Sequence, residues 1–297
     1  MRLLVTGTHG QVVTALKARA STHLNVTALG RPELDLATAK DLAELLRSFS
    51  PDVIVNAAAF TAVDKAESEA EQAFAVNSGG AKAVARAASK LNVPMIQIST
   101  DYVFDGTASQ PLSENDAVNP IGVYGASKLA GELAVAAETE NFVILRTAWV
   151  YAPFGASFVR TMLRLAATRD EVRVVADQFG TPTSALDIAS AIETIAESLL
   201  RHPQNSELVG IFNLTAQGGP ISWADFATEI FTQSDALGGP SARVIPISTA
   251  EYPTPAKRPA YSCLNGEKLS RLHGTQLPQW KVGLSEVLTQ IKKGHWL

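Results

Sequence analysis

Short apolar runs rich in β-branched residues alternate with longer segments of alanine, leucine and charged residues through the first half of the chain. The runs are too short for helices and are typical of buried strands, whereas the segments between them contain little glycine or proline and favour helix. Strands are expected at residues 3–6, 26–29, 53–56, 95–99 and 143–147, and helices at 40–49, 70–91 and 127–138. This alternation predicts an α/β fold, a doubly wound parallel Rossmann sheet with helices on both faces.

The pattern becomes less regular after about residue 150. Residues 211–214 form a short apolar run that we expect to return to the first sheet as a further strand. Residues 252–259 hold three prolines and predict an extended connection. Helices are expected at 157–168, 186–200, 223–232 and 284–292. We therefore expect a larger domain over 1–150, with a returning segment near 208–222, and a smaller carboxyl-terminal domain over 151–297.

Composition narrows the classes of partner. With 297 residues, 46% of them hydrophobic, the chain can bury a substantial core. A formal net charge of -4 argues against nucleic acid as the main partner, since phosphate binding favours a basic protein. We find no apolar stretch long enough to cross a membrane, and residues 1–7 indicate a first strand rather than a secretory signal. Cys263 is the only cysteine, so we expect a reducing compartment, the cytoplasm.

A glycine-containing loop follows the first predicted strand. It reads Thr-Gly-Thr-His-Gly-Gln-Val-Val over residues 6–13 and precedes a helical segment. Gly7 suits the tight turn and Gly10 lets the backbone approach a pyrophosphate, which the free N–H groups of a helix start would bind. Val13 stands where the dinucleotide-binding fingerprint has a third glycine, which predicts that the helix lies slightly further from the strand. An ordinary strand-to-helix turn explains this loop about equally well.

Tyr124 and Lys128 are spaced four residues apart at the start of a predicted helix. This interval places both side chains on one helix face. A phenol is a poor acid at neutral pH, and a neighbouring ammonium group makes its proton easier to donate. We interpret Tyr124 as a general acid and Lys128 as the group that tunes it; a surface tyrosine beside a solvated lysine is the alternative.

A polar triplet, Ser99-Thr100-Asp101, follows the fourth predicted strand. Ligands of open parallel sheets bind outside the carboxyl ends of the strands, where this triplet lies. Thr100 is suited to hydrogen-bond a reacting carbonyl group. Taken singly, a strand-terminating hydroxyl and a turn-capping aspartate are the simpler interpretations of Thr100 and Asp101.

Together these motifs resemble the extended short-chain dehydrogenase/reductases and, within them, the family of dTDP-4-dehydrorhamnose reductases. The resemblance spans almost the whole chain, and several long matches in the right order make it far more specific than either short motif. They lie at 55–59, 61–67, 99–104, 124–132, 146–151, 177–183 and 254–259, with Ser262 and Leu264 beyond.

The resemblance implies roles for individual residues. The catalytic residues that it implies are Tyr124, Lys128 and Thr100. The residues expected to bind NADPH are Gly7, Gly10, Gln11, Val12, Arg31, Asp35, Leu36, Ala59, Phe60, Thr61, Ile98, Tyr124 and Lys128, all in the 1–150 domain. Among them Arg31 is expected from its place after the second strand and not from the resemblance. The residues implied in binding a dTDP-sugar are Thr100, Asp101, Tyr124, Trp149 and Arg258. Arg258 makes electrostatic sense there, because a diphosphate on an acidic protein needs a local cation.

Two departures from the family bear on cofactor and assembly. Gly30-Arg31 stands where relatives often carry an acidic residue, and an arginine favours NADPH over NADH, although use of NADH stays open. Ala15 stands where some members have a glutamate that helps hold a metal between subunits, and Gln290 replaces another. We therefore expect no metal site, while a homodimer that is not metal-linked stays open.

The implied reaction is reduction of the C4 ketone of dTDP-4-dehydro-L-rhamnose to dTDP-L-rhamnose with NADPH. Three alternatives remain: a reductase of a related 4-keto sugar nucleotide, a sugar-nucleotide dehydratase, and a non-catalytic NADP-binding regulatory subunit of the same fold. The dehydratase is disfavoured because Asp101 is followed by Tyr102, whereas the resemblance to sugar-nucleotide dehydratases would require an Asp-Glu pair at this place. Turnover with a 4-keto sugar nucleotide discriminates the regulatory subunit from an enzyme.

Overall fold

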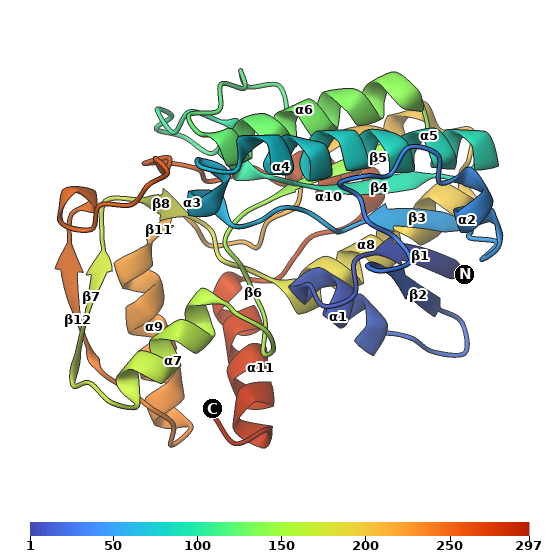
Figure 1. Ribbon diagram of the computed structural model, residues 1–297. Helices are drawn as coiled ribbons and strands as arrows, with labels where there is room; N and C mark the ends of the chain where they lie inside the picture. The colour runs from blue at the N-terminus through green and yellow to red at the C-terminus, as the bar shows by residue number, and fades with distance from the viewer. Residues whose placement is uncertain (297) are drawn as a thin grey trace.

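The computed structural model describes residues 1–296, and its centre is a six-stranded sheet in the order β10-β5-β4-β3-β1-β2 (Figure 1). All hydrogen-bonded neighbours in this sheet are parallel. The strands are β1 (Arg2–Thr6), β2 (Asn25–Leu29), β3 (Val53–Asn56), β4 (Met95–Thr100), β5 (Phe142–Thr147) and β10 (Gly210–Asn213). The predicted doubly wound α/β fold is confirmed, and so is the return of the 211–214 run to the sheet.

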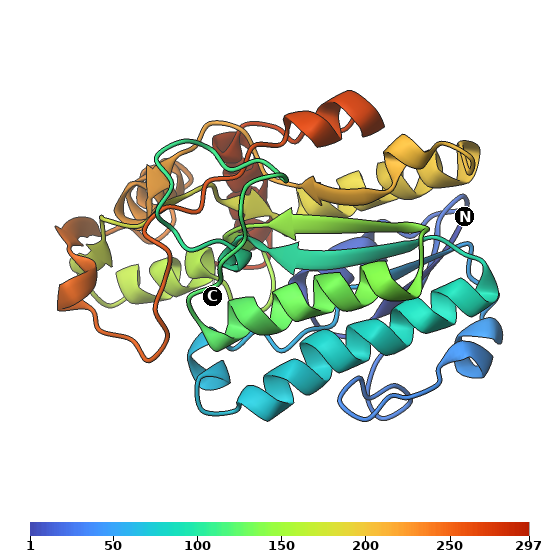
Figure 2. The same cartoon turned by 90° about the horizontal axis from the view of Figure 1, so that it is seen from above.

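Helices cover both faces of this sheet. α1 (Gln11–Ala18) and α8 (Ala185–Arg201) lie on one face, while α5 (Ala81–Leu91) and α6 (Val123–Glu138) lie side by side on the other (Figures 1 and 2). Leu3 and Val5 pack toward the first face, whereas Leu4 packs toward the second, because successive strand residues face opposite sides. Burial on both faces explains the continuous apolar runs.

The helices agree with the expected segments, with some shifts of their ends. The segment 70–91 is helical throughout, but the π-helical turn η1 (Ala75–Gly80) separates α4 from α5. α6 begins at Val123, before the expected 127, and so includes Tyr124 in its first turn. The remaining helices are α2 (Ala43–Arg47), α3 (Val63–Ala66), α4 (Ala70–Phe74), α7 (Phe158–Ala166), α9 (Trp223–Ala236), α10 (Glu267–His273) and α11 (Trp280–Lys293).

The strand order reverses direction between β1 and β3. β1 pairs with β2 on one side and with β3 on the other, so the crossover from β1 to β2 and the crossover from β2 to β3 run in opposite directions. Between β2 and β3 the chain forms only turns and the short helix α2, and no further strand lies outside β2 in the sheet. Ligands of open α/β sheets bind at such a switch point, outside the carboxyl ends of the strands.

The second half of the chain builds a smaller layer from three short strand pairs. β7 (Glu171–Val175) pairs with β12 (Arg243–Ile247) in parallel, and β6 (Val150–Tyr151) pairs with β9 (Thr183–Ser184) in parallel. β8 (Phe179–Gly180) and β11 (Ile221–Ser222) are antiparallel. Helices α7, α9 and α11 pack around them, at the left and bottom of Figure 1. Residues 252–259 are irregular, as their prolines predict.

Parts of the second half return to the large sheet. β10 pairs with β5, and α8 packs on α1, so both complete the layer built by the first half. α10 packs on β10 as well. The division at residue 150 stays a prediction, and these contacts indicate that any boundary between the two parts is crossed several times by the chain.

Two glycines let α6 approach its neighbours closely. A Cβ atom at Gly125 would lie 2.1 Å from the carbonyl oxygen of Tyr102, and one at Gly131 would lie 2.2 Å from that of Asn77. Both contacts are with backbone atoms, which cannot rotate away as a side chain can. Any larger residue therefore forces the helix that carries Tyr124 and Lys128 to shift.

We expect Gly131→Ala to lower the free energy of unfolding by about 2 kcal/mol, because overpacking against the Asn77 backbone outweighs the better helix propensity of alanine. Urea unfolding of the two proteins measures this. Leu133→Ala, at a position 66% exposed on the same helix, is the control and should change stability by less than about 0.5 kcal/mol. Equal stability of Gly131→Ala and the parent would show that a methyl group fits between α6 and the Asn77 backbone.

Candidate active site

A cavity of about 710 Å³ lies at the switch point, outside the carboxyl ends of β1, β2 and β3. The predicted cofactor residues that line it are Gly7, Gly10, Arg31, Asp35, Leu36, Ala59, Phe60 and Thr61. It is also lined by residues that the sequence did not single out, among them Thr8, His9, Lys65, Glu69 and Gln72. Gln11 and Val12 lie beside it in the first turn of α1, while Ile98, Tyr124 and Lys128 belong to β4 and α6. One cavity is therefore lined by the glycine loop, the turn after β2 and the loop after β3.

The glycine loop has the geometry of an anion-binding turn. Gly7 adopts a φ of 96°, which side chains disfavour, and a Cβ there would lie 3.4 Å from both Ala58 and Val13. Val13 is thus packed directly against the turn and is 1% exposed. No side chain caps the start of α1, which leaves its first N–H groups for a ligand. The buried Oε1 of Gln11 has no hydrogen-bond partner among residues 1–296. These features fit a dinucleotide pyrophosphate.

The turn after β2 forms the part of the cavity rim next to the glycine loop. Arg31 is exposed there and makes no hydrogen bond or ion pair within residues 1–296. Asp35 instead accepts a hydrogen bond from the backbone N–H of Ala37 at 3.0 Å, and Glu33 makes no ion pair with Arg31. The guanidinium group of Arg31 therefore stays available to an anionic ligand.

Asn77 fixes the loop that carries Ala59, Phe60 and Thr61. Its Oδ1 accepts from the N–H of Phe60 at 2.8 Å, and its Nδ2 donates to the carbonyl of Phe60 at 3.1 Å and to Ser127 Oγ at 2.9 Å. Ser127 in turn donates to the carbonyl oxygen of Tyr124. Asn77 lies in the π-helical turn, a distortion common at functional sites. The sequence does not predict this role of Asn77, because an asparagine within a helical pattern carries no signal of its partners.

The polar triplet at the end of β4 lies next to Tyr124. Thr100 Oγ1 donates to Asp101 Oδ1 at 3.0 Å and accepts from the N–H of Tyr102 at 3.2 Å. Asp101 is 2% exposed, and its Oδ2 has no hydrogen-bond partner within the described chain. The ring of Tyr102 meets that of Tyr124 edge to face, with 5.6 Å between centroids. The structure thus brings Thr100, Asp101 and Tyr124 together.

Burial controls the ionisation of Tyr124 and Lys128. Desolvation raises the pKa of Tyr124 to about 12, and the Thr100 hydroxyl opposes part of that rise. Desolvation also lowers the pKa of Lys128 to about 8, and its Nζ donates to the carbonyl of Ile98 at 2.6 Å. We expected the ammonium to make the phenol more acidic, but in the protein alone burial dominates. Tyr124 therefore keeps its proton at neutral pH.

A buried ion pair lies directly behind the triplet. Arg146 of β5 donates to Glu132 of α6 at 2.7 Å, and both side chains are almost fully buried. Ser99 donates to the same carboxylate at 2.5 Å, and the Arg146 guanidinium lies 5.2 Å from the centre of the Phe104 ring. This cluster ties β4, β5 and α6 together at the point where Thr100 begins the site. Removing one partner would leave an uncompensated buried charge.

Trp149 lies where the chain passes from the sheet to the smaller layer. Its φ of 49° is in the left-handed region that side chains disfavour. Its ring stacks on that of Trp223 with 3.5 Å between centroids and 6° between planes, and a Cβ at Gly180 would lie 2.6 Å from it. Strained backbone of this kind is concentrated at functional sites. Trp223 is a second aromatic residue of this region that the sequence analysis assigned only to a helix.

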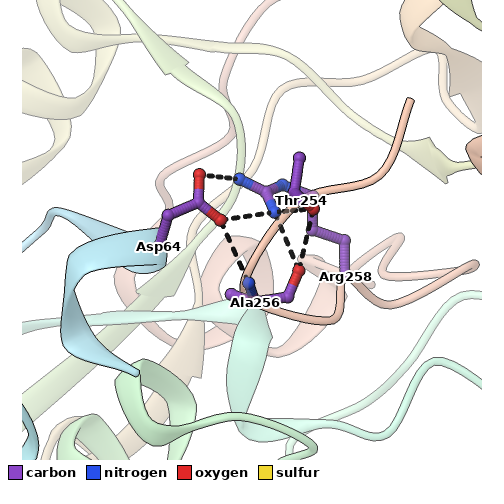
Figure 3. Close-up of polar contacts among 4 residues, drawn as sticks. All are labelled: Asp64, Thr254, Ala256 and Arg258. Carbon is purple, nitrogen blue, oxygen red and sulfur yellow. Dashed lines mark hydrogen bonds and ion pairs between the residues drawn. The ribbon is translucent and has the colours of Figure 1, made fainter. Parts of the chain in front are cut away.

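Arg258 is committed to a partner within the chain (Figure 3). Its two terminal nitrogens bind Asp64 of α3 at 3.0 and 2.9 Å, and Nη1 also reaches the Thr254 hydroxyl and the Ala256 carbonyl oxygen. The backbone N–H of Ala256 donates to Asp64 as well. The family resemblance predicts that this guanidinium meets a diphosphate, whereas in the structure it anchors the proline-rich segment to α3. Hydrogen bonding to Arg258 keeps the pKa of Asp64 below its usual value.

Metal ligation and membrane insertion find no support within residues 1–296. No group of three or more histidine, cysteine, aspartate and glutamate side chains is arranged to hold a metal ion there. Within the same residues every helix is too short or too polar to span a bilayer.

A parallel sheet with a glycine loop at its switch point, and a Tyr-x-x-x-Lys helix beside the end of β4, define an extended short-chain dehydrogenase/reductase. The chain belongs within that class to the family described as RmlD substrate binding domain, whose model matches residues 1–293. The dTDP-4-dehydrorhamnose reductase of Sinorhizobium fredii is 52% identical over 281 residues, 95% of this chain and 94% of that protein.

Solved structures agree with this assignment. A dTDP-4-dehydrorhamnose reductase from Clostridium acetobutylicum matches with a TM-score of 0.88 and 38% identity, over 98% of this chain and 100% of that one. The reductase from Bacillus anthracis, solved in complex with NADP, matches with a TM-score of 0.89 and 33% identity, over 97% and 99%. The family expected from the sequence motifs is confirmed.

We expect Asp101→Asn to stabilise the protein at pH 8 by about 2 kcal/mol. Desolvation raises the pKa of Asp101 to about 6, so its ionisation as the pH rises through that value costs folding free energy. The asparagine keeps an acceptor for Thr100 but carries no charge. Urea unfolding at pH 4 and pH 8 should show the gain mainly at pH 8, because the cost builds up between the ordinary carboxyl pKa of 3.8 and the raised value of about 6.

Asp105→Asn is the control, because hydrogen bonds from Thr107 hold the pKa of the Asp105 carboxyl below its usual value. It should give no gain at pH 8. An Asp101→Asn protein that is destabilised equally at both pH values would contradict a buried, strained carboxylate.

Proposed function

We propose that this protein reduces the C4 ketone of dTDP-4-dehydro-L-rhamnose to dTDP-L-rhamnose with NADPH. The observation that carries the proposal is the combination of a full-length family match with an intact Thr100, Tyr124 and Lys128 at the end of β4. The single cysteine, Cys263, is free and buried, which suits catalysis in the reducing cytoplasm.

The cavity at the switch point supports NADPH as the cofactor. Gly7, Gly10 and the start of α1 hold the pyrophosphate, and Asp35 and Leu36 face the adenine side. Ala59 and Thr61, on the loop that Asn77 clamps to α6, contact the ribose and nicotinamide side. Bound there, the reduced nicotinamide supplies the hydride.

The chain's own residues supply the proton and its control. Tyr124 is the general acid, since its phenol keeps the proton at neutral pH and lies beside the Thr100 hydroxyl. Thr100 turns its hydroxyl proton from Asp101 to the substrate carbonyl oxygen and holds that oxygen by a hydrogen bond. Lys128 gains a ribose contact in place of the Ile98 carbonyl and brings its charge to the phenol. Positioned acid catalysis of this kind contributes roughly 10²- to 10⁴-fold.

The sugar nucleotide binds between the end of β4, where Asp101 lies, and the smaller layer. Asp101 and Trp149 contact the sugar, and the stacked Trp223 holds the Trp149 ring in place. The segment around Arg258 forms the outer wall, with the guanidinium shared between Asp64 and the substrate diphosphate. A charge-assisted contact of Arg258 to the diphosphate competes with the ion pair between Arg258 and Asp64. Because the Asp64 side chain is exposed, water can solvate its carboxylate when that ion pair weakens.

The defining experiment incubates the protein with NADPH and dTDP-4-dehydro-L-rhamnose and identifies the sugar formed by NMR. Formation of dTDP-L-rhamnose with stoichiometric NADPH oxidation is the expected result. Oxidation only with another 4-keto sugar nucleotide would overturn the substrate and leave the reductase. NADPH binding with no turnover on any such sugar would indicate a regulatory subunit instead.

We expect Tyr124→Phe to keep cofactor affinity and lower kcat by roughly 10²-fold or more, because the ring remains while the proton is lost. Stopped-flow NADPH oxidation and fluorescence titration measure the two quantities. Tyr102→Phe is the matched control, since its ring packs on Tyr124 but its hydroxyl has no assigned part in the reaction. A Tyr124→Phe enzyme nearly as active as the parent would remove Tyr124 as the acid.

We expect NADPH to be preferred over NADH, and Arg31→Ala to reduce that preference by about tenfold. Arg31 offers charged donors to the 2′-phosphate, worth roughly 1.5 to 3 kcal/mol, and no described residue pairs with it. The ratio of kcat/KM for the two cofactors is the measurement. Equal use of both cofactors by the parent, or an unchanged ratio in the variant, would contradict this role.

A further inference from the structure

The helix that carries Tyr124 begins without a cap from its own sequence. α6 starts at Val123, one residue before Tyr124, and the preceding Gly122 has no side chain that could accept from the first turn. The N–H of Ala126 donates to the carbonyl of Gly122, whereas the N–H groups of residues 123–125 have no acceptor in the helical pattern. The first turn of α6 therefore needs an acceptor from elsewhere in the fold.

Glu67 supplies this acceptor from another element. Its Oε1 accepts a hydrogen bond from the N–H of Val123 at 2.9 Å, across 56 residues of sequence. A Cβ at Gly122 would lie 2.9 Å from the same oxygen, so the glycine leaves room for the carboxylate. A carboxylate at the N-terminus of a helix also interacts favourably with the helix dipole. The start of α6 is thus held by the residue that directly follows α3.

The short helix α3 also holds the outer wall of the proposed substrate site. Asp64 of this helix binds Arg258 and the backbone N–H of Ala256 (Figure 3). Asp64 and Glu67 are three residues apart, an interval that makes them neighbours on the surface of a helical turn. The side chain of Ala66, between them, is fully buried and anchors the turn. One helical turn therefore ties the proline-rich segment to the start of α6.

We propose that Glu67 is a positioning residue for Tyr124, which it directs toward the substrate carbonyl group by fixing the first turn of α6. The assignment rests on the proposed function, because it takes Tyr124 as the general acid. The hydrogen bond of Glu67 goes to the backbone of Val123 and not to the side chain of Tyr124. Its loss therefore affects proton transfer, which depends on orientation, more than the binding of either ligand.

The test measures kcat, KM and the Kd of NADPH in variants that remove, keep or replace the cap. Glu67→Ala should lower kcat by about tenfold and leave KM and Kd within about twofold. Glu67→Gln keeps an acceptor oxygen, so its kcat should stay within about twofold of the parent. Adding Gly122→Ser to Glu67→Ala should restore most of kcat, because a serine in this extended conformation can cap the helix and the alanine leaves space for it.

Hydrogen exchange of the amides of residues 123–126, followed by mass spectrometry, reports the first turn without any substrate. Exchange should be faster in Glu67→Ala and should return toward the parent rate in Glu67→Gln and in the double variant. Glu71→Ala is the matched control, since it removes an exposed acidic residue from the first turn of α4, a helix with no assigned catalytic residue. It should change neither kcat nor exchange in α6.

Four results would overturn the proposal: an unchanged kcat in Glu67→Ala, a loss confined to KM or to NADPH binding, a Glu67→Gln protein as impaired as Glu67→Ala, or no recovery in the double variant. The second would mean that Glu67 shapes a binding site, and the third that its charge matters and not its hydrogen bond. A parent that reduces no 4-keto sugar nucleotide would instead refute the proposed function, while hydrogen exchange would still decide whether Glu67 caps α6.

Discussion

The active site depends on how closely α6 can approach the end of β4 and the π-helical turn before α5. Gly125 and Gly131 allow this approach, because backbone carbonyl oxygens of Tyr102 and Asn77 occupy the space that a side chain would take. Tyr124 and Lys128 project from the same helix, so their position relative to Thr100 follows from that packing. A displacement of α6 by an ångström would separate the acid from the carbonyl it serves, and positioning errors of that size cost orders of magnitude in rate.

Buried polar side chains hold the surroundings of this contact in one arrangement. Thr6 donates to Asn56, which donates to Gln97, and Gln97 and Lys128 both donate to the carbonyl of Ile98. This chain of hydrogen bonds crosses β1, β3 and β4 and links the strand before the glycine loop to the catalytic helix. Polar groups buried at strand ends are costly unless they are paired, so such a network specifies a single register of the sheet.

Burial shifts the pKa values of the ionisable side chains in the site, which affects both folding stability and chemistry. Burial raises the pKa of both Tyr124 and Asp101 and lowers that of Lys128. Tyr124 is thereby kept neutral at neutral pH, whereas Asp101 ionises at a cost in free energy and Lys128 holds its proton less firmly than a solvated lysine. Ligands that bring a ribose hydroxyl, a carbonyl or a phosphate to these side chains relieve part of that cost, which ties binding energy to the state competent for reaction.

Much of this protein follows from its sequence alone. The central strands, the parallel sheet and the return of the 211–214 run were predicted because β-branched runs buried on both faces leave a strong local pattern. The motifs around Gly7, Thr100 and Tyr124 predicted the family, since each needs particular residue types at fixed spacing. The reversal at β1 was only implied, because strand order depends on crossover packing and not on any one segment.

Contacts between residues distant in the chain were decided only by the tertiary structure. Three such contacts join separate elements: the hydrogen bonds between Asn77 and Phe60, the stacking of Trp149 on Trp223, and the ion pair of Arg258 with Asp64. No spacing rule connects such pairs, and a basic residue in a motif says nothing of the carboxylate that packing brings to it. The lowered pKa of Lys128 has the same origin, because burial is a property of the assembled fold.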